Sequence, residues 1–217
     1  MGRIYLVRHG EVDFNRANAY IGRTDLPLNE TGLTQARLLA NYLTSKDISQ
    51  VYSSTLARSA KTAEIVAEKL NLPVTRISQL RELDYGDWEG VPQKIVAEKY
   101  GEVYTEWHQR PLETRVPGGE SIAMLIDRIQ PAFQAIAESC RNRNVVIVGH
   151  KCVNRVLLCL ALDIDPTFYR QIGQANAAIN ILEAREDGRI IVERINDTCH
   201  LTQTSVLYSP ETPQEPL

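Results

Sequence analysis

Several features are missing from this sequence of 217 residues, and each absence narrows the possible classes of protein. No apolar run approaches the ~18 residues that a membrane-spanning helix needs, and the first residues do not have the pattern of a signal peptide. The formal net charge of −3 argues against an electrostatic nucleic-acid binder. We therefore expect a cytoplasmic protein with no membrane or nucleic-acid partner, in which any anion site is a local cluster of cations.

Cysteine and histidine are scarce. The four cysteines form no C-x-x-C pair and lie beside apolar residues, which favours reduced thiols. The four histidines have neither H-x-x-x-H nor H-E-x-x-H spacing, so the sequence does not predict a metal site. The glycine-rich motifs G-x-G-x-x-G and G-x-x-x-x-G-K-[ST] are also missing, which argues against a nucleotide-binding module. We expect no cofactor.

The apolar pattern predicts alternating strands and helices. Strands are expected at 4–7, 50–52, 72–75 and 145–148, and a β-hairpin from 179–182 and 190–192. Helices are expected at about 33–43, 122–137 and 153–160, and a further helix should begin at caps within 53–55 and end at about 70. This order predicts an α/β three-layer sandwich, with helices on both faces of a mostly parallel sheet. We expect one domain over 1–201, a cap-like insertion at about 84–119 with a helix at 93–100, and a flexible tail over 202–217.

Two of the four histidines directly follow predicted buried strands. Val7 leads into Arg8-His9, and Val148 leads into Gly149-His150. Ligands of parallel sheets bind beyond the carboxyl ends of the strands, so we expect these histidines to act as a pair. A cation beside a histidine lowers the histidine pKa and keeps one ring nitrogen available, as a nucleophile requires.

Arg58 is expected in the first turns of a helix that begins near Ser54. Helix N-termini favour anions, and a guanidinium group binds two phosphate oxygens at once. Alone, an arginine at this position is more often a solvated side chain. Together with Arg8, His9 and His150 it predicts a pocket for a phosphoryl dianion, and hence a small phosphorylated metabolite as partner.

These residues belong to an ordered series of motifs. The series consists of Arg8-His9-Gly10-Glu11, Asn15, Gly22, Asp25, Leu28, Thr31-Gly32, Ser53–Ala63, Glu82–Gly90, Pro117–Ser121 and Val148–His150. It resembles the motifs of the histidine phosphatase superfamily, the phosphoglycerate-mutase-like proteins, over about residues 4–201. The sequence departs from the family at Phe14, where many members have Trp, and at Lys151, where many have Gly.

The resemblance implies a metal-independent phosphatase in which His9 is the nucleophile and becomes phosphorylated. Arg8, Arg58 and His150 would bind the transferring phosphoryl group. Glu82 would protonate the leaving alkoxide and then deprotonate the attacking water, a role that rests on the resemblance alone. The candidate substrate-binding residues are Asn15, Gly22, Tyr85, Lys151 and His200.

The substrate is less well defined. The segment Asp197–Leu201 resembles the C-terminal end of metal-independent phosphoserine phosphatases, so L-phosphoserine, a metabolite of serine biosynthesis, is the preferred hypothesis. His200 would then donate to its carboxylate, and Tyr85 with the segment around Trp88–Trp107 would form the opposite wall. Position 85 is His in many of those enzymes.

The sequence leaves other hypotheses for the function open. An α-ribazole-phosphate or broad-specificity phosphatase is the main alternative. A phosphoglycerate mutase fits less well, because Asp84–Gly90 resembles the phosphatase branch. A non-catalytic phosphate-binding protein on the same fold is the alternative from another class. Exposed aliphatic residues of the last hairpin would support a homodimer.

Overall fold

The computed structural model describes residues 2–17, 19–140 and 142–201. Within these ranges six strands form one sheet in the order β3-β2-β4-β1-β5-β6. The strands are β1 (Gly2–Arg8), β2 (Ile48–Ser53), β3 (Val74–Arg76), β4 (Asn144–Gly149), β5 (Ile179–Ala184) and β6 (Ile190–Asp197). The first four strands run parallel, and β5 lies antiparallel between β1 and β6. The mostly parallel sheet is confirmed.

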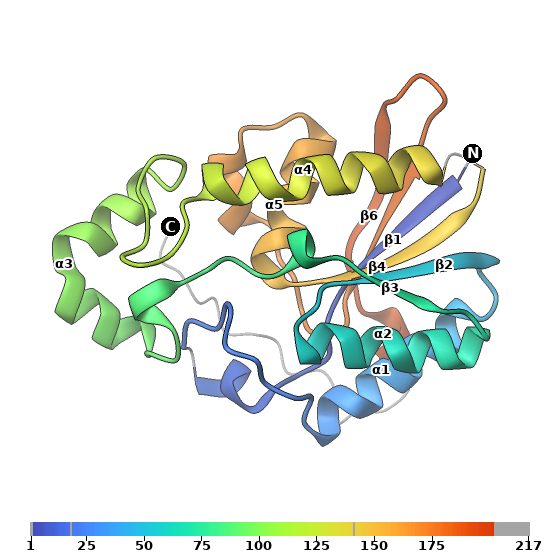
Figure 1. The fold of residues 1–217 in the computed structure, drawn as a ribbon, viewed down its shortest axis with the longest axis horizontal. Coiled ribbons are helices and arrows are strands. Elements are labelled where there is room, and N and C mark those ends of the chain that lie inside the picture. Colours follow the sequence, from blue (N-terminus) through green and yellow to red (C-terminus); the bar gives the residue numbers. More distant parts are fainter. Residues whose placement is uncertain (1, 18, 141, 202–217) are drawn as a thin grey trace.

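Helices cover both faces of this sheet (Figure 1). They are α1 (Glu30–Leu43), α2 (Ala57–Leu70), α3 (Gln93–Gln109), α4 (Ile122–Ser139) and α5 (Lys151–Leu162), with short 3₁₀ helices η1 (Asp13–Ala17), η2 (Ser78–Leu80), η3 (Gly86–Trp88), η4 (Pro166–Gln171) and η5 (Cys199–Leu201). Successive side chains of a strand point to opposite faces. Ile4 and Leu6 of β1 therefore pack with α4 and α5, whereas Tyr5 and Val7 pack with α1 and α2. The predicted three-layer sandwich is confirmed.

The N-terminus of α2 differs from the prediction. The helix begins at Ala57, and no side chain of residues 53–55 caps it. Instead, the carboxylate of Asp25 accepts a hydrogen bond from the backbone N–H of Ala57 at 2.6 Å. The hydroxyl of Ser54 accepts from the N–H of Leu56 at 3.1 Å and lies 2.7 Å from Nε2 of His150. A residue distant in sequence thus supplies the cap, and Ser54 contacts the histidine.

The two ends of the predicted insertion lie next to each other in the folded chain. The N–H of Glu120 donates to the carbonyl of Asp84 at 2.9 Å. Between Asp84 and Glu120, α3 continues to Gln109, beyond the predicted end near residue 100. The chain kinks at Gly101 (φ 12°, ψ −79°) and then resumes the helix. In Figure 1, α3 lies beyond one end of the sheet.

Two tryptophans stabilise this part of the molecule from inside. Trp88 and Trp107 are 0% and 1% exposed, and their rings meet at 90° with centroids 5.4 Å apart. Tyr20, from the loop after η1, packs on both rings. Both tryptophan side chains are therefore used in the core, whereas Tyr85 and Gln93 of the same region line the cavity described below.

The last part of the chain is described only in part. Strand β6 extends to Asp197, past the predicted 190–192. The predicted tail, 202–217, lies outside the described residues. Among the helices of the described ranges, none has both the length and the apolar character to cross a membrane.

Candidate active site

The carboxyl ends of two neighbouring strands bring the predicted histidines together. Arg8 of β1 is in register with Gly149 of β4. The residues that follow them, His9 and His150, therefore leave the sheet side by side, and their ring centroids are 5.2 Å apart. His150 is fully buried, and burial, followed by Arg58, holds its pKa well below 6.5. The expected juxtaposition of the two histidines is found.

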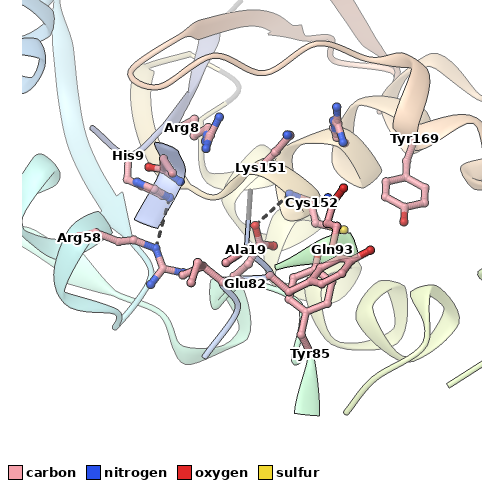
Figure 2. Close-up of a pocket in the computed structure, with 14 residues that line it drawn as sticks. Arg8, His9, Ala19, Arg58, Glu82, Tyr85, Gln93, Lys151, Cys152 and Tyr169 are labelled. Atoms are coloured by element: carbon pink, nitrogen blue, oxygen red, sulfur yellow. Dashed lines mark hydrogen bonds between the residues drawn. The ribbon is translucent and has the colours of Figure 1, made fainter. Parts of the chain in front are cut away.

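Two hydrogen bonds define the tautomer of His9. Nδ1 lies 2.7 Å from the carbonyl oxygen of Gly10, which can only accept, so Nδ1 carries the ring proton. Nε of Arg58 donates to Nε2 at 3.3 Å, and Nε2 therefore holds the lone pair (Figure 2). Burial, then Arg58 and Arg8, hold the pKa of His9 well below 6.5. The neighbouring cations act as predicted, although burial is the larger cause.

Backbone carbonyls hold the guanidinium group of Arg58. Its Nη1 donates to the carbonyl of Thr24 at 2.9 Å, and its Nη2 donates to the carbonyl of Gly22 at 2.7 Å. A Cβ atom at Gly22 would lie 1.9 Å from the carbonyl oxygen of Leu83, so only glycine fits there. Gly22 is not among the residues that line the cavity described below. Its position makes it a support for Arg58 rather than the predicted substrate contact.

Glu89 organises the turn that carries these carbonyls. Its carboxylate accepts hydrogen bonds from the N–H groups of Gly22, Arg23 and Thr24 at 3.1, 2.7 and 3.2 Å, and from the hydroxyl of Thr24 at 2.7 Å. It also accepts from the N–H of Tyr85 at 3.2 Å. Sequence reasoning gave Glu89 no role. Its place in the motif Glu82–Gly90 was the available signal.

Glu82 is held at the N-terminus of α5. Its carboxyl group accepts from the N–H groups of Cys152 at 3.0 Å, Val153 at 3.2 Å and Leu83 at 2.9 Å. The first of these bonds is visible in Figure 2. The side chain is 4% exposed. A glutamate that looks solvated in the sequence is therefore a fixed group at the cavity.

Arg8 and Asn15 are tied to the loop before β5. Nη1 of Arg8 donates to the carbonyl of Gln174 at 2.5 Å. The amide oxygen of Asn15 accepts from the N–H of Val12 at 3.0 Å and from Nδ2 of Asn176 at 3.2 Å. The loop over residues 174–176, which no motif pointed to, thus helps to position both predicted side chains.

One cavity of about 70 Å³ joins these groups. It is lined by Arg8, His9, Asn15, Ala19, Tyr20, Ile21, Arg58, Glu82, Tyr85, Gln93, Lys151, Cys152, Arg155 and Tyr169. A single water needs roughly 10–15 Å³ measured in the same way, so the cavity accepts a phosphoryl group with a small attached group. Of the predicted set, His150, Gly22 and His200 are not in this lining; Arg155 is a cation that the sequence reasoning missed.

The position of His200 does not fit the predicted substrate contact. Its ring packs on Tyr42 of α1, with centroids 5.7 Å apart. Burial lowers its pKa to about 4, against an opposing effect of Asp197. After β6 the chain turns into η5, and this turn directs the imidazole against α1.

The site and the fold together define a class of protein. Cations surround a buried neutral histidine at the carboxyl ends of a parallel sheet, where α/β enzymes bind small ligands. The Histidine phosphatase superfamily (branch 1) profile matches residues 4–198, and the chain belongs to this family. The predicted phosphatase is confirmed, and its substrate is a phosphorylated small molecule.

Named relatives and solved structures agree with this assignment. Phosphoserine phosphatase 1 of Hydrogenobacter thermophilus is 34% identical over 201 residues, which are 93% of this chain and 95% of that protein. A phosphoserine phosphatase mutant from Entamoeba histolytica, solved in complex with phosphoserine, has a TM-score of 0.83 at 25% identity, covering 93% of this chain and all of that one. The α-ribazole phosphatase of Shigella flexneri has a TM-score of 0.82 at 24% identity over 90% of this chain and 96% of that one, which shows the shared fold alone.

Proposed function

We propose that this protein hydrolyses phosphate monoesters through a phosphohistidine formed on His9, and that L-phosphoserine is its substrate. The observation that carries the proposal is the Nδ1–H tautomer of His9, which leaves the lone pair of Nε2 beside Arg58 at the cavity. A neutral imidazole in this orientation is ready to attack phosphorus without first losing a proton.

In the first step, Nε2 of His9 forms a bond to phosphorus and the ester P–O bond breaks. The bonding electrons leave with the ester oxygen, and a proton from the carboxyl group of Glu82 neutralises the resulting alkoxide. Arg8, Arg58 and His150 bind the transferring oxygens, and the two arginines supply positive charge to them. A loose phosphoryl transition state requires this kind of positioning and countercharge.

In the second step, water attacks phosphorus and the P–N bond breaks. The electron pair returns to Nε2, and Glu82 takes the proton of the water. Both steps thus use the same carboxyl group, first as acid and then as base. The three backbone N–H groups that hold Glu82 keep it beside the reacting atoms throughout.

Several observations favour L-phosphoserine. The relative with 34% identity is named a phosphoserine phosphatase, and it matches this chain over nearly its full length. A solved structure of similar fold contains phosphoserine.

The test is labelling followed by a substrate panel. Wild-type protein mixed with ³²P-phosphoserine and quenched within milliseconds should carry acid-labile, alkali-stable label, and His9→Ala should carry none while keeping its circular dichroism spectrum. Among phosphoserine, α-ribazole phosphate, 3-phosphoglycerate and sugar phosphates, phosphoserine should have the highest kcat/KM. Normal turnover by folded His9→Ala would refute the nucleophile, and a better ester in the panel would refute the substrate.

A further inference from the structure

The charges that line the cavity exceed those that a phosphoryl group requires. Four cationic side chains contribute to the lining, namely Arg8, Arg58, Lys151 and Arg155, and among the described lining residues Glu82 is the single carboxylate. A phosphate monoester brings two negative charges at neutral pH. Arg8 and Arg58 place their charge on His9, and Lys151 and Arg155 line the same cavity with them.

The second pair lies on one side of α5. Lys151 is the first residue of this helix and Arg155 follows four residues later, a spacing that places side chains next to each other on one face. Nε of Arg155 donates to the carbonyl of Ile172 at 2.6 Å, which fixes the plane of its guanidinium group. In the view of Figure 2, Lys151 lies between His9 and Tyr169. Both cations line the cavity.

The N-terminus of α5 adds to their effect on an anion. The partial positive charge of a helix is concentrated in its first turn, where Lys151 lies. The carboxyl group of Glu82 accepts hydrogen bonds from the N–H groups of the second and third residues of this helix. Lys151 and Arg155, both partly buried, give the cavity lining positive charge beside this helix end, which favours a second anionic group on the ligand.

We propose that Lys151 and Arg155 form a subsite for the carboxylate of the substrate. This inference rests on the proposed function and deepens it, because it names the groups that select a phosphorylated carboxylic acid over other small phosphate esters. A planar guanidinium with one edge fixed presents its remaining N–H groups to a carboxylate, and the ammonium of Lys151 adds a second point of contact. Hydrolysis itself proceeds at His9.

The test compares substrates that differ in the carboxylate alone. Phosphoserine and phosphoethanolamine form one pair, and 3-phosphoglycerate and glycerol 3-phosphate form a second. For each pair the ratio of kcat/KM values is measured in wild type, Lys151→Met and Arg155→Gln. The ratio should fall about tenfold or more in each variant, as expected for the loss of one hydrogen bond between charged groups. Lys61→Met removes an exposed cation on α2, outside this cavity, and should keep the wild-type ratio.

The outcomes separate the two proposals. If both members of each pair lose activity equally in folded Lys151→Met, the subsite is wrong, even where phosphoserine remains the best substrate. If wild type rejects phosphoserine, but prefers 3-phosphoglycerate to glycerol 3-phosphate in a manner that depends on Lys151, the subsite stands and the proposed substrate is wrong. Lys151→Met carries the decision if Arg155→Gln, which loses its bond to Ile172, does not fold.

Discussion

At His9, the direction of one hydrogen bond decides which ring nitrogen can react. The Gly10 carbonyl accepts a hydrogen bond from Nδ1–H, and Arg58 both donates to Nε2 and opposes protonation by its charge. The same arginine that would bind the phosphoryl group thus keeps the nucleophile neutral. Burial is the larger cause and acts in the same direction, so the pKa of His9 lies well below 6.5.

This electrostatic effect can be measured directly. Nitrogen-15 NMR of the ring should show the neutral Nδ1–H tautomer of His9 at pH 6. Arg58→Gln should shift the pKa of His9 upward, because it removes one of the charges that lower it. An imidazolium signal for wild-type His9 at pH 6 would contradict the tautomer assigned from the structure.

Glu82 gives a prediction that depends on the leaving group. Glu82→Gln should lower kcat/KM for phosphoserine by about 10²–10⁴-fold, the range typical of general acid catalysis. The loss for p-nitrophenyl phosphate should be much smaller, because nitrophenolate leaves without a proton. Equal losses on both esters would mean that Glu82 serves to hold α5 and not to transfer a proton.

Single residues were predictable to the extent that their chemistry is local. Arg8 and His9 stand out because they follow a buried strand, and Glu82 was identified through the family resemblance alone. Arg155 was missed, although its spacing from Lys151 on a predicted helix was a usable signal. The motif Glu82–Gly90 pointed to Glu89, but its role could not be inferred, because its partners at residues 22–24 lie 65–67 residues away in the sequence.

At the level of elements, one carboxylate links the insertion to the reacting group. Glu89 follows η3 and binds the turn at residues 22–24, and the carbonyls of that turn hold Arg58 of α2. Three segments that are distant in sequence thus meet at one guanidinium group. Its position depends on the turn rather than on α2 alone.

The expected effect of Glu89→Gln follows from this chain of contacts. A glutamine directs an NH₂ group at backbone donors, so the turn should shift and kcat/KM should fall, by up to about 10²-fold for a displacement near 1 Å. The loss should be non-additive with that of Arg58→Lys, because both changes act through one group. Glu98→Gln, an exposed glutamate on α3, is the matched control. Additive losses would show that Glu89 only stabilises the fold.

The order of elements was predictable from apolar periodicity, but several boundaries were not. Helix α2 takes its cap from Asp25, which only the folded chain brings near. Helix α3 passes through Gly101, a residue type that ordinarily ends a helix. His200 seemed suited to the substrate because of its place in a terminal motif, whereas packing directs it to Tyr42.

For the molecule as a whole, a net charge of −3 coexists with a cationic cavity. We expect that Arg8 and Arg58 supply the countercharge that a metal ion supplies in other phosphatases. Incubation with EDTA followed by desalting should therefore leave kcat/KM unchanged. Loss of activity that added Mg²⁺ or Zn²⁺ restores would overturn this expectation.

The stability of the whole fold should fall in mild acid because buried histidines must remain neutral. Burial lowers the pKa of His200 to about 4, below the 6.5 of an unfolded chain. Between these values the unfolded state binds a proton that the folded state does not, so the free energy of unfolding falls as pH decreases from 6.5 to 4. The decrease in the free energy of unfolding from this residue is at most about 3 kcal/mol, and His9 and His150 act in the same direction.

His200→Phe keeps a ring against Tyr42 and cannot be protonated. Urea denaturation at pH 7.5 and pH 4.5 should therefore show a smaller decrease in the free energy of unfolding in the variant than in wild type. An equal decrease in both proteins would assign the acid sensitivity to other groups.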